Sequence, residues 1–217
     1  MKRVMIDIET LGVKNDAVVL SIAALGFKFC GIDEVGPRAS WIAPEGYVWY
    51  PSLREQFARG RSVSEGTLEW WQRDELAGAR ADWAYLDGVK CEEMIESVYQ
   101  SLAQVVENAD EVWADGIVFD IGILESLFSP LPPPWKSYNV ARDLRTVRNL
   151  LPVKRFHTGP PLVGFAHDPL YDCKHQIETL WSLWPEEPKE NAKLFRPELF
   201  ERAVAESPEP SVDRLRE

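Results

Sequence analysis

The chain has 217 residues, a formal net charge of −11, 45% hydrophobic residues and 27% charged residues. This length supports one sizeable core and a tail, and the composition is ordinary for a globular domain. No apolar run approaches the ~20 residues that a membrane-spanning helix needs, so we expect no membrane insertion. The negative charge argues against nonspecific coating of nucleic acid, which Lys and Arg drive. It does not exclude a nuclease whose carboxylates hold metal ions.

Three cysteines, Cys30, Cys91 and Cys173, are odd in number and widely spaced. This pattern fits reduced thiols rather than a disulfide framework or a cysteine zinc site. Because the first predicted strand begins almost at the N-terminus, we expect no signal peptide. The expected location is the cytoplasm of a bacterium or of a phage-infected host.

The first predicted strand covers residues 2–9 and carries two acids within an apolar run. Buried strands of an α/β sheet are nearly continuous Val and Ile runs, in which an acid is costly unless it is paired or binds a metal ion. Because side chains two apart share a strand face, Asp7 and Glu9 project together and repel each other. A cation such as Mg²⁺ or Mn²⁺ would turn this repulsion into attraction. An exposed edge strand with an acidic outer face is the alternative.

The later elements predict an α/β fold, a mixed sheet with helices on its faces. Further strands are expected at 18–29, 38–43 and 111–114, and loops at 47–64 and 78–88. A helix capped by Ser64 or Thr67 carries Leu68, Trp70 and Trp71. The other expected helices are 89–108, 121–128, 142–151 and 168–184. One domain is expected over 1–184, followed by an acidic, Pro/Glu-rich tail over 185–217 with room for one helix at 195–205.

Three later residues can join the two acids. Asp120 follows a strand at the start of a helix, where Asp also serves as an N-cap. Asp172 lies about one turn into the helix that Asp168 and Pro169 begin, where a contact with the helix dipole is the alternative role. His167 precedes that cap on a loop, and a base held beside a metal cluster can take a proton from water.

Three parts of this sequence, Asp7-Ile8-Glu9-Thr10, Phe119-Asp120, and His167 with Asp172, carry a resemblance to a known family. They resemble the three motifs of the DEDDh, or DnaQ-like, 3′–5′ exonuclease superfamily. A closer likeness is to T-even-phage exodeoxyribonuclease A and the RNase T-like exoribonucleases. It includes Thr67-Leu68-Glu69-Trp70-Trp71, Arg142-Asp143-Leu144-Arg145-Thr146 and Gly164-Phe165-Ala166-His167-Asp168. The resemblance spans residues 4 to about 184 and implies an RNase H-like fold with helices on both faces of the sheet.

The resemblance implies a two-metal-ion 3′–5′ exonuclease that releases 5′-nucleoside monophosphates from the 3′ end of single-stranded DNA or RNA. It implies that Asp7, Glu9, Asp120 and Asp172 hold two Mg²⁺ or Mn²⁺ ions and that His167 is the general base. Two alternatives stay open. One is a non-catalytic scaffold that binds nucleic acid or protein, and the other is a phosphodiesterase of short oligonucleotides. The sequence also leaves a homodimer open.

Aromatic side chains hold single-stranded bases by stacking, worth roughly 1–3 kcal/mol each. The candidates here are Phe119, Trp70 and Trp71, with core packing as the alternative for each. Thr10 fits the family pattern after the first motif, and Leu11 can wedge against the terminal base.

A basic stretch over 136–155 stands out in an otherwise acidic chain. Arg145 and Arg148 share one face of a predicted helix with Arg142 and are candidates for phosphate contacts. A solvated helix face is the alternative. Asp143 lies between arginines, so we expect a salt-bridged structural role for it rather than metal binding.

Overall fold

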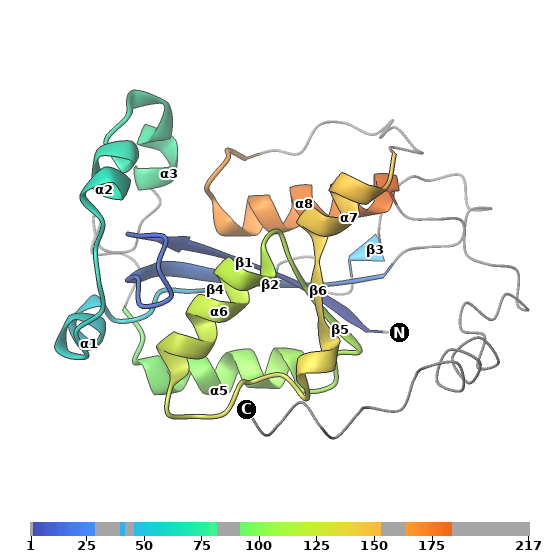
Figure 1. Cartoon of the computed structure of the whole chain (residues 1–217), viewed down its shortest axis with the longest axis horizontal. Helices are drawn as coiled ribbons and strands as arrows, with labels where there is room; N and C mark the ends of the chain where they lie inside the picture. The colour runs from blue at the N-terminus through green and yellow to red at the C-terminus, as the bar shows by residue number, and fades with distance from the viewer. Residues whose placement is uncertain (1, 29–39, 42–45, 82–91, 153–163, 184–217) are drawn as a thin grey trace, which may run out of the picture. The chain divides into compact units, whose positions relative to one another are not determined.

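The computed structural model describes residues 2–28, 40–41, 46–81, 92–152 and 164–183. In chain order, the strands are β1 (Arg3–Thr10), β2 (Val19–Lys28), β3 (Ser40–Trp41), β4 (Tyr47–Trp49), β5 (Glu111–Ala114) and β6 (Ala141–Asp143). The α-helices are α1 (Leu53–Ala58), α2 (Glu65–Trp71), α3 (Ala77–Ala81), α5 (Ile95–Val106), α6 (Ile117–Phe128), α7 (Leu144–Leu150) and α8 (Pro169–Leu183), shown in Figure 1. Two short 3₁₀ helices cover Asp74–Leu76 and Tyr138–Val140. The predicted tail, 185–217, and its helix at 195–205 lie outside the described residues.

The six described strands form one mixed sheet, in which β1 is central. The order is β3-β2-β1-β5-β6, and β4 also pairs with β2. β1 runs antiparallel to β2, so that Asp7 lies opposite Ala23 and Glu9 lies opposite Ser21. On its other side β1 runs parallel to β5, which in turn runs parallel to β6. The carboxyl ends of these three strands therefore point toward the same edge of the sheet.

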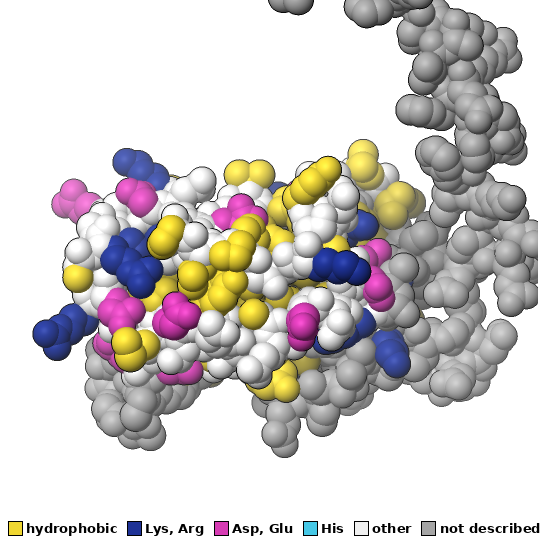
Figure 2. All heavy atoms as spheres, turned by 90° about the horizontal axis from the view of Figure 1, so that it is seen from below, with side chains coloured by type: hydrophobic (Ala, Val, Ile, Leu, Met, Phe, Trp, Pro, Cys, Tyr) yellow, Lys and Arg dark blue, Asp and Glu magenta, His cyan; other side chains and the backbone are white. Residues whose placement is uncertain are grey.

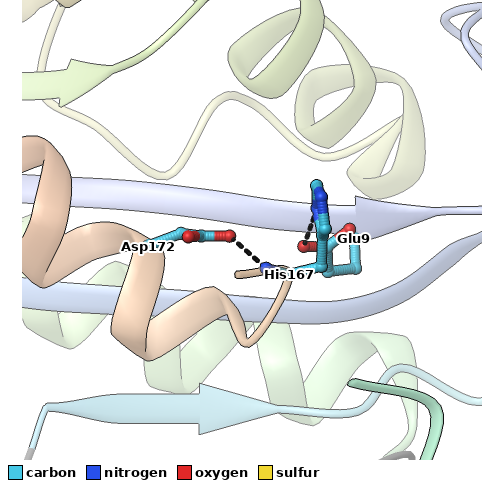
Figure 3. A group of neighbouring side chains, drawn as sticks. All are labelled: Glu9, His167 and Asp172. Atoms are coloured by element: carbon cyan, nitrogen blue, oxygen red, sulfur yellow. Dashed lines mark hydrogen bonds and ion pairs between the residues drawn. The ribbon is translucent and has the colours of Figure 1, made fainter. Parts of the chain in front are cut away.

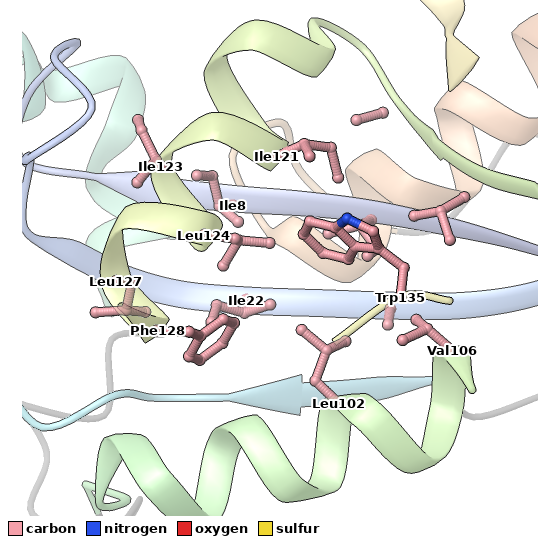
Figure 4. Packing of buried hydrophobic residues seen from close by; sticks show 14 of the residues in the cluster. Ile8, Ile22, Leu102, Val106, Ile121, Ile123, Leu124, Leu127, Phe128 and Trp135 are labelled. Atoms are coloured by element: carbon pink, nitrogen blue, oxygen red, sulfur yellow. The ribbon is translucent and has the colours of Figure 1, made fainter. Parts of the chain in front are cut away.

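Helices cover both faces of this sheet, as the sequence predicted (Figure 1). On one face, Val4, Ile6 and Ile8 of β1 pack against α5 and α6. On the other face, Met5 packs against Cys173 and other buried residues of α7 and α8. Figure 4 shows the first of these layers, where strand residues meet side chains of α5 and α6. Full burial of each such side chain stabilises the fold by about 1.5–3 kcal/mol.

The stretch 47–64, predicted as a loop, contains both β4 and α1. Ser52 caps α1 by accepting the backbone N–H of Glu55. Gln56 is fully buried and acts as a sheet partner for β2, because its side chain accepts from the Val19 N–H at 2.7 Å and donates to the Val19 carbonyl at 2.8 Å. The prediction was wrong because this pairing is made by a side chain distant in sequence, which local composition does not reveal.

Helix boundaries also differ from the predicted ones. The helix predicted over 142–151 begins at Leu144, because the preceding residues form β6 against β5. Asp143 is structural, as expected, but it acts as the N-cap of α7 by accepting the Arg145 N–H at 3.1 Å. The pattern also placed the start of α5 too early and that of α6 too late, and it missed α3 at the edge of a predicted loop.

None of the helices in the described ranges combines the length and the apolarity needed to cross a membrane. Figure 2 views the molecule from the side of α5, where hydrophobic side chains gather across the middle of the face among charged ones. Most apolar side chains of the described core are nevertheless fully buried in the layers above and below the sheet.

Candidate active site

An open pocket of about 620 Å³ lies at the carboxyl end of β1. All five residues that the sequence predicted for the chemistry line it: Asp7, Glu9, Asp120, His167 and Asp172. They come from three places in the chain, namely the end of β1, the first turn of α6 and the start of α8. Because β1 and β5 are parallel, the turn after β5 brings α6 to the end of β1 where the two acids lie.

The two acids of β1 lie on its α8 side, where water is scarce. Asp7 accepts a hydrogen bond of 2.6 Å from the Gln176 amide on α8, and Glu9 is 7% exposed. Burial, with added repulsion from Asp120, Glu9 and Asp172, raises the pKa of Asp7 well above its usual range, while the Gln176 hydrogen bond lowers it. Burial, together with the charges of Asp172 and Asp120, likewise raises the pKa of Glu9. The metal-free pocket therefore favours protonation of these acids.

Asp120 lies inside the first turn of α6 and is 4% exposed. The alternative role of helix cap is wrong for it, because the N-cap of α6 is Gly116. Burial, followed by the negative charge of Asp115, raises the pKa of Asp120 to about 7. The charge of Arg145 and a hydrogen bond with the backbone of Ile8 act in the opposite direction.

His167 and Asp172 are tied together by the backbone. The residue before the α8 cap, His167, has a left-handed conformation with φ 67°, and its backbone N–H donates to Asp172 Oδ2 at 2.7 Å. Figure 3 shows this bond and the imidazole turned toward Glu9, with Nδ1 3.5 Å from Glu9 Oε1. Burial raises the pKa of Asp172, and the His167 backbone hydrogen bond opposes that shift. The five-residue spacing thus holds both the imidazole and a carboxylate at one corner of the pocket.

The imidazole also rests on the paired tryptophans of α2. Trp70 meets the His167 ring edge to face at a centroid distance of 4.8 Å, and Trp71 lies at 6.0 Å. Such edge-to-face contacts favour particular ring orientations, so both tryptophans help to hold the imidazole at the pocket wall. The helix start that positions these rings was predicted correctly, since Ser64 caps α2 by accepting the Thr67 N–H.

The donor set fits a hard divalent cation. Single ligand atoms of Glu9, His167 and Asp172 lie within 4.8 Å of one another. Asp7 and Asp120 line the same pocket, so that carboxylate oxygens dominate its polar surface. Mg²⁺ and Mn²⁺ prefer such oxygen ligands, and a bound cation would relieve the repulsion that raises these pKa values.

Of the predicted substrate-binding residues, Thr10, Phe119, Trp70 and Arg145 line the pocket. Trp71 and Leu11 are not among the residues that line it, and both side chains are buried, at 2% and 8% exposure. The Trp71 indole N–H donates to the Thr10 carbonyl at 2.9 Å, and both side chains belong to one small core cluster. Both side chains therefore pack in the core, the alternative role that the sequence left open for the tryptophans.

Arg145 and Arg148 both bind Asp115, at the turn after β5. Arg145 Nη2 donates to the Asp115 carbonyl at 2.5 Å, and Arg148 Nη1 lies 2.9 Å from Asp115 Oδ2. The Arg145 guanidinium packs over Gly116, where an added Cβ would lie 2.9 Å from Nη2. Only Arg145 of this pair lines the pocket. The third arginine of the predicted helix face, Arg142, lies in β6 and contacts Glu111.

Sequence reasoning missed Asp115, His175 and Gln176, which also line the pocket. Asp115 was read only as a turn residue. Gln176 follows Asp172 by four residues on α8, so the helical period alone places it on the same face as a predicted metal ligand. That spacing was the available signal, although a neutral amide has no charge that would mark it as part of an acidic site.

The fold is shared with known exonucleases. E. coli exonuclease I, in its zinc-bound complex with single-stranded DNA, matches with a TM-score of 0.52 and 15% identity over 94% of this chain and 43% of that one. The product-bound structure of exonuclease I matches with a TM-score of 0.48 and 14% identity over 94% of this chain and 46% of that one. Cell-death related nuclease 4 matches with a TM-score of 0.48 and 14% identity over 83% of this chain and 62% of that one.

The chain therefore spans less than half the length of exonuclease I. None of the curated proteins matches the sequence. The model of one family, described as the 3′–5′ exoribonuclease Rv2179c-like domain, matches residues 2–184. This match and the exonuclease fold confirm the RNase H-like mixed sheet and the exonuclease resemblance seen in the sequence motifs. The chain belongs to the family of Rv2179c-like 3′–5′ exoribonuclease domains.

Proposed function

We propose that the chain is a metal-dependent 3′–5′ exonuclease of the DEDDh type, which releases 5′-nucleoside monophosphates from single-stranded RNA. The observation that carries this proposal is the meeting of Asp7, Glu9, Asp120, Asp172 and His167 around one open pocket. RNA is favoured over DNA by the family description, whereas the DNA complex of exonuclease I keeps a DNA substrate in play.

Four carboxylates would hold the ions, those of Asp7, Glu9, Asp120 and Asp172. When bound, two Mg²⁺ or Mn²⁺ ions acidify a water molecule and stabilise the negative charge on the leaving oxygen. The protein prepares this binding by concentrating acids whose mutual repulsion a cation would relieve in place of protons. One oxygen of Asp172 already accepts the His167 N–H, which leaves its other oxygen with both lone pairs for an ion.

His167 acts as the general base. Its ring lies at the pocket wall, held by Glu9 on one side and by Trp70 on another. It takes a proton from water as the water oxygen attacks the terminal phosphorus. The bond from phosphorus to the 3′-oxygen of the penultimate nucleotide then breaks, and that oxygen takes up a proton from solvent. A nucleoside 5′-monophosphate leaves, and the shortened strand keeps a free 3′-hydroxyl.

The pocket walls favour an unpaired strand end. Trp70 and Phe119 line the pocket from α2 and α6, and each is only partly buried, so a ring face is available to stack on a base. Arg145 is exposed at the rim beside Asp120 and can contact a phosphate. The apolar walls and one guanidinium suit a nucleotide better than they suit a small anion.

The experiment compares labelled RNA and DNA oligonucleotides of one sequence, each single-stranded or fully paired, and the corresponding dinucleotides, with Mg²⁺, with Mn²⁺ or with EDTA. We expect stepwise shortening from the 3′ end of the single-stranded RNA, release of 5′-monophosphates and no cleavage in EDTA. Cleavage that persists in EDTA would contradict the metal assignment. Binding without cleavage under all metal conditions would indicate the scaffold alternative, and cleavage restricted to dinucleotides would indicate the short-oligonucleotide phosphodiesterase.

A further inference from the structure

The side chain of Gln176 is an uncharged group placed among the acids of the pocket. It lies on α8 one helical turn beyond Asp172, is 8% exposed and lines the pocket. Its Nε2 donates to Asp7 Oδ1 at 2.6 Å. The bond links the central strand to the helix that also carries Asp172.

Chemistry determines which end of the amide faces Asp7. When a bound cation keeps Asp7 ionised, its carboxylate can only accept hydrogen bonds, so the NH₂ group must face it and the carbonyl oxygen must turn away, as it does here. That oxygen, Oε1, is buried and has no hydrogen-bond partner within the part of the chain that the structure describes. A buried acceptor left unpaired costs about 1–3 kcal/mol, so a donor supplied by an occupant of the pocket would be stabilising.

A second buried glutamine shows what a purely structural amide looks like in this fold. Gln56 is fully buried, and both ends of its amide are used: Nε2 donates to the Val19 and Pro51 carbonyls, and Oε1 accepts the Val19 N–H. Gln176 has the same chemistry and a similar burial, but only one end is bonded, and that end holds a predicted metal ligand. The difference indicates a role toward the contents of the pocket.

We infer that Gln176 is a positioning residue of the metal site, which orients the Asp7 carboxylate toward the cation and presents Oε1 to a donor on the bound water or nucleotide. The inference rests on the proposed function. The amide occupies one oxygen of Asp7 and restricts rotation of the carboxylate, so that the ligand is in place before the ion arrives. Hydrogen bonds of this kind to a metal ligand are worth about 10–100-fold in metal affinity when removed.

The test measures Mn²⁺ binding to the full chain by calorimetry, without nucleic acid. Gln176→Met keeps the length of the side chain and removes the amide, and we expect its Mn²⁺ affinity to fall by about 10–100-fold. The matched control, Gln56→Met, makes the same change in a buried amide outside the pocket and should leave Mn²⁺ affinity within about twofold. Saturating Mn²⁺ should restore part of the nuclease activity of Gln176→Met, since it offsets the weakened metal binding but not the lost contact of Oε1.

Gln176→Asn serves as the second variant if the methionine variant does not fold, because a shorter side chain also breaks the 2.6 Å bond. Mn²⁺ affinity within about twofold of the parent, in either folded variant, would overturn the inference. So would an equal loss of affinity in Gln56→Met, which would show that any damage to the core weakens the site. If the parent chain itself binds no Mn²⁺, the proposed function fails instead, so the two failures are distinguishable.

Discussion

The two faces of strand β1 are built from alternate residues of the same eight-residue segment, yet they do different work. Toward α5 and α6 the strand presents Val4, Ile6 and Ile8, all buried among apolar side chains. Toward α8 it presents Met5 and then the two acids, whose pKa values burial and repulsion raise. One face stabilises the fold, and the other gathers acids whose negative charge is unfavourable there unless a proton or, as we propose, a cation offsets it.

The difference shows how the protein separates stability from chemistry with a period of two residues. A substitution on the apolar face removes packing and leaves the acids unchanged. A substitution on the acidic face removes repulsion and leaves the packing largely unchanged. Substitutions on the apolar face should therefore lower stability and spare activity, whereas substitutions of the acids should abolish activity and spare stability. This difference between neighbouring positions can be tested.

The largest expected effect is on activity. Asp7→Ala, or Asp172→Ala, should abolish nuclease activity, while the metal-free stability stays unchanged or rises, because an acid leaves a like-charged cluster. Ile6→Ala, on the opposite face of the same strand, should lower the free energy of unfolding by about 2–5 kcal/mol and leave the activity of the folded fraction near the parent value. Urea unfolding and a nuclease assay on each purified variant measure both quantities. A destabilised Asp7→Ala with residual activity would break the comparison.

The next effect concerns the base. His167→Ala should lose on the order of 10²–10⁴ in rate, the usual span for general-base catalysis, while Mn²⁺ still binds. Raising the pH should partly restore the rate of this variant, since hydroxide from solvent replaces the missing base. Calorimetry in parallel with the rate measurement distinguishes the roles. An equal loss of Mn²⁺ binding would make His167 a ligand, as its place beside Glu9 and Asp172 would also allow.

A third prediction concerns how the stability of the acid cluster depends on pH. The pKa of Asp120 is about 7 in the folded chain, against an ordinary value of 3.8. A raised pKa means that the folded state binds the proton more tightly, so the stability from protonation is complete below 3.8 and is lost as the pH rises through 7. One such group gives a slope of about 1.4 kcal/mol per pH unit within that window.

Urea unfolding in EDTA between pH 5 and 8 measures this slope (about three pH units, within reach of one buffer series). We expect the metal-free parent to lose stability as the pH rises, and Asp120→Asn to show a flatter dependence, because the titrating group is gone. Asp143→Asn changes an acid outside the pocket and is the matched control. A parent and an Asp120→Asn variant with identical slopes would show that the raised pKa of Asp120 does not exist.

The smallest effect concerns phosphate contacts at the rim. Arg145→Ala plus Arg148→Ala should raise KM for long oligonucleotides and leave hydrolysis of a dinucleotide nearly unchanged. Each lost phosphate contact should reduce the slope of binding against salt by about 0.7 for a single strand. Because only Arg145 lines the pocket, the single variant Arg145→Ala should account for most of the change. An unchanged salt slope in the double variant would place the strand on the Trp70 side alone.

Much of the site was predictable because its residues violate the apolar pattern around them. Asp7 and Glu9 interrupt an apolar strand, and Asp168 with Pro169 marks a helix start that α8 confirms. The short strand β5 was predicted with its observed limits. In these places the local pattern and the fold demand the same residues, so local reasoning was sufficient.

What could not be predicted depends on partners distant in sequence. β4 and β6 have three residues each and exist only because β2 and β5 lie beside them. Trp70 and Trp71 could not be told apart from the sequence, although Trp70 lines the pocket and Trp71 is buried in the core. Gln176 carries no charge and belongs to no motif, so its contact with Asp7 became visible only in three dimensions.

The bond between the His167 backbone and the Asp172 carboxylate has a practical consequence for trapping a substrate complex. Asp172→Ala would remove the acceptor of this N–H together with the carboxylate, so the backbone at His167 would be held less tightly where the strand is expected to bind. Asp172→Asn keeps an oxygen that can accept the same N–H, so the loop should stay fastened while the charge is lost. For capturing an uncleaved strand in a crystal or a pull-down, the asparagine variant is therefore the better inactive protein, because it loses the charge but keeps the hydrogen bond to the His167 N–H.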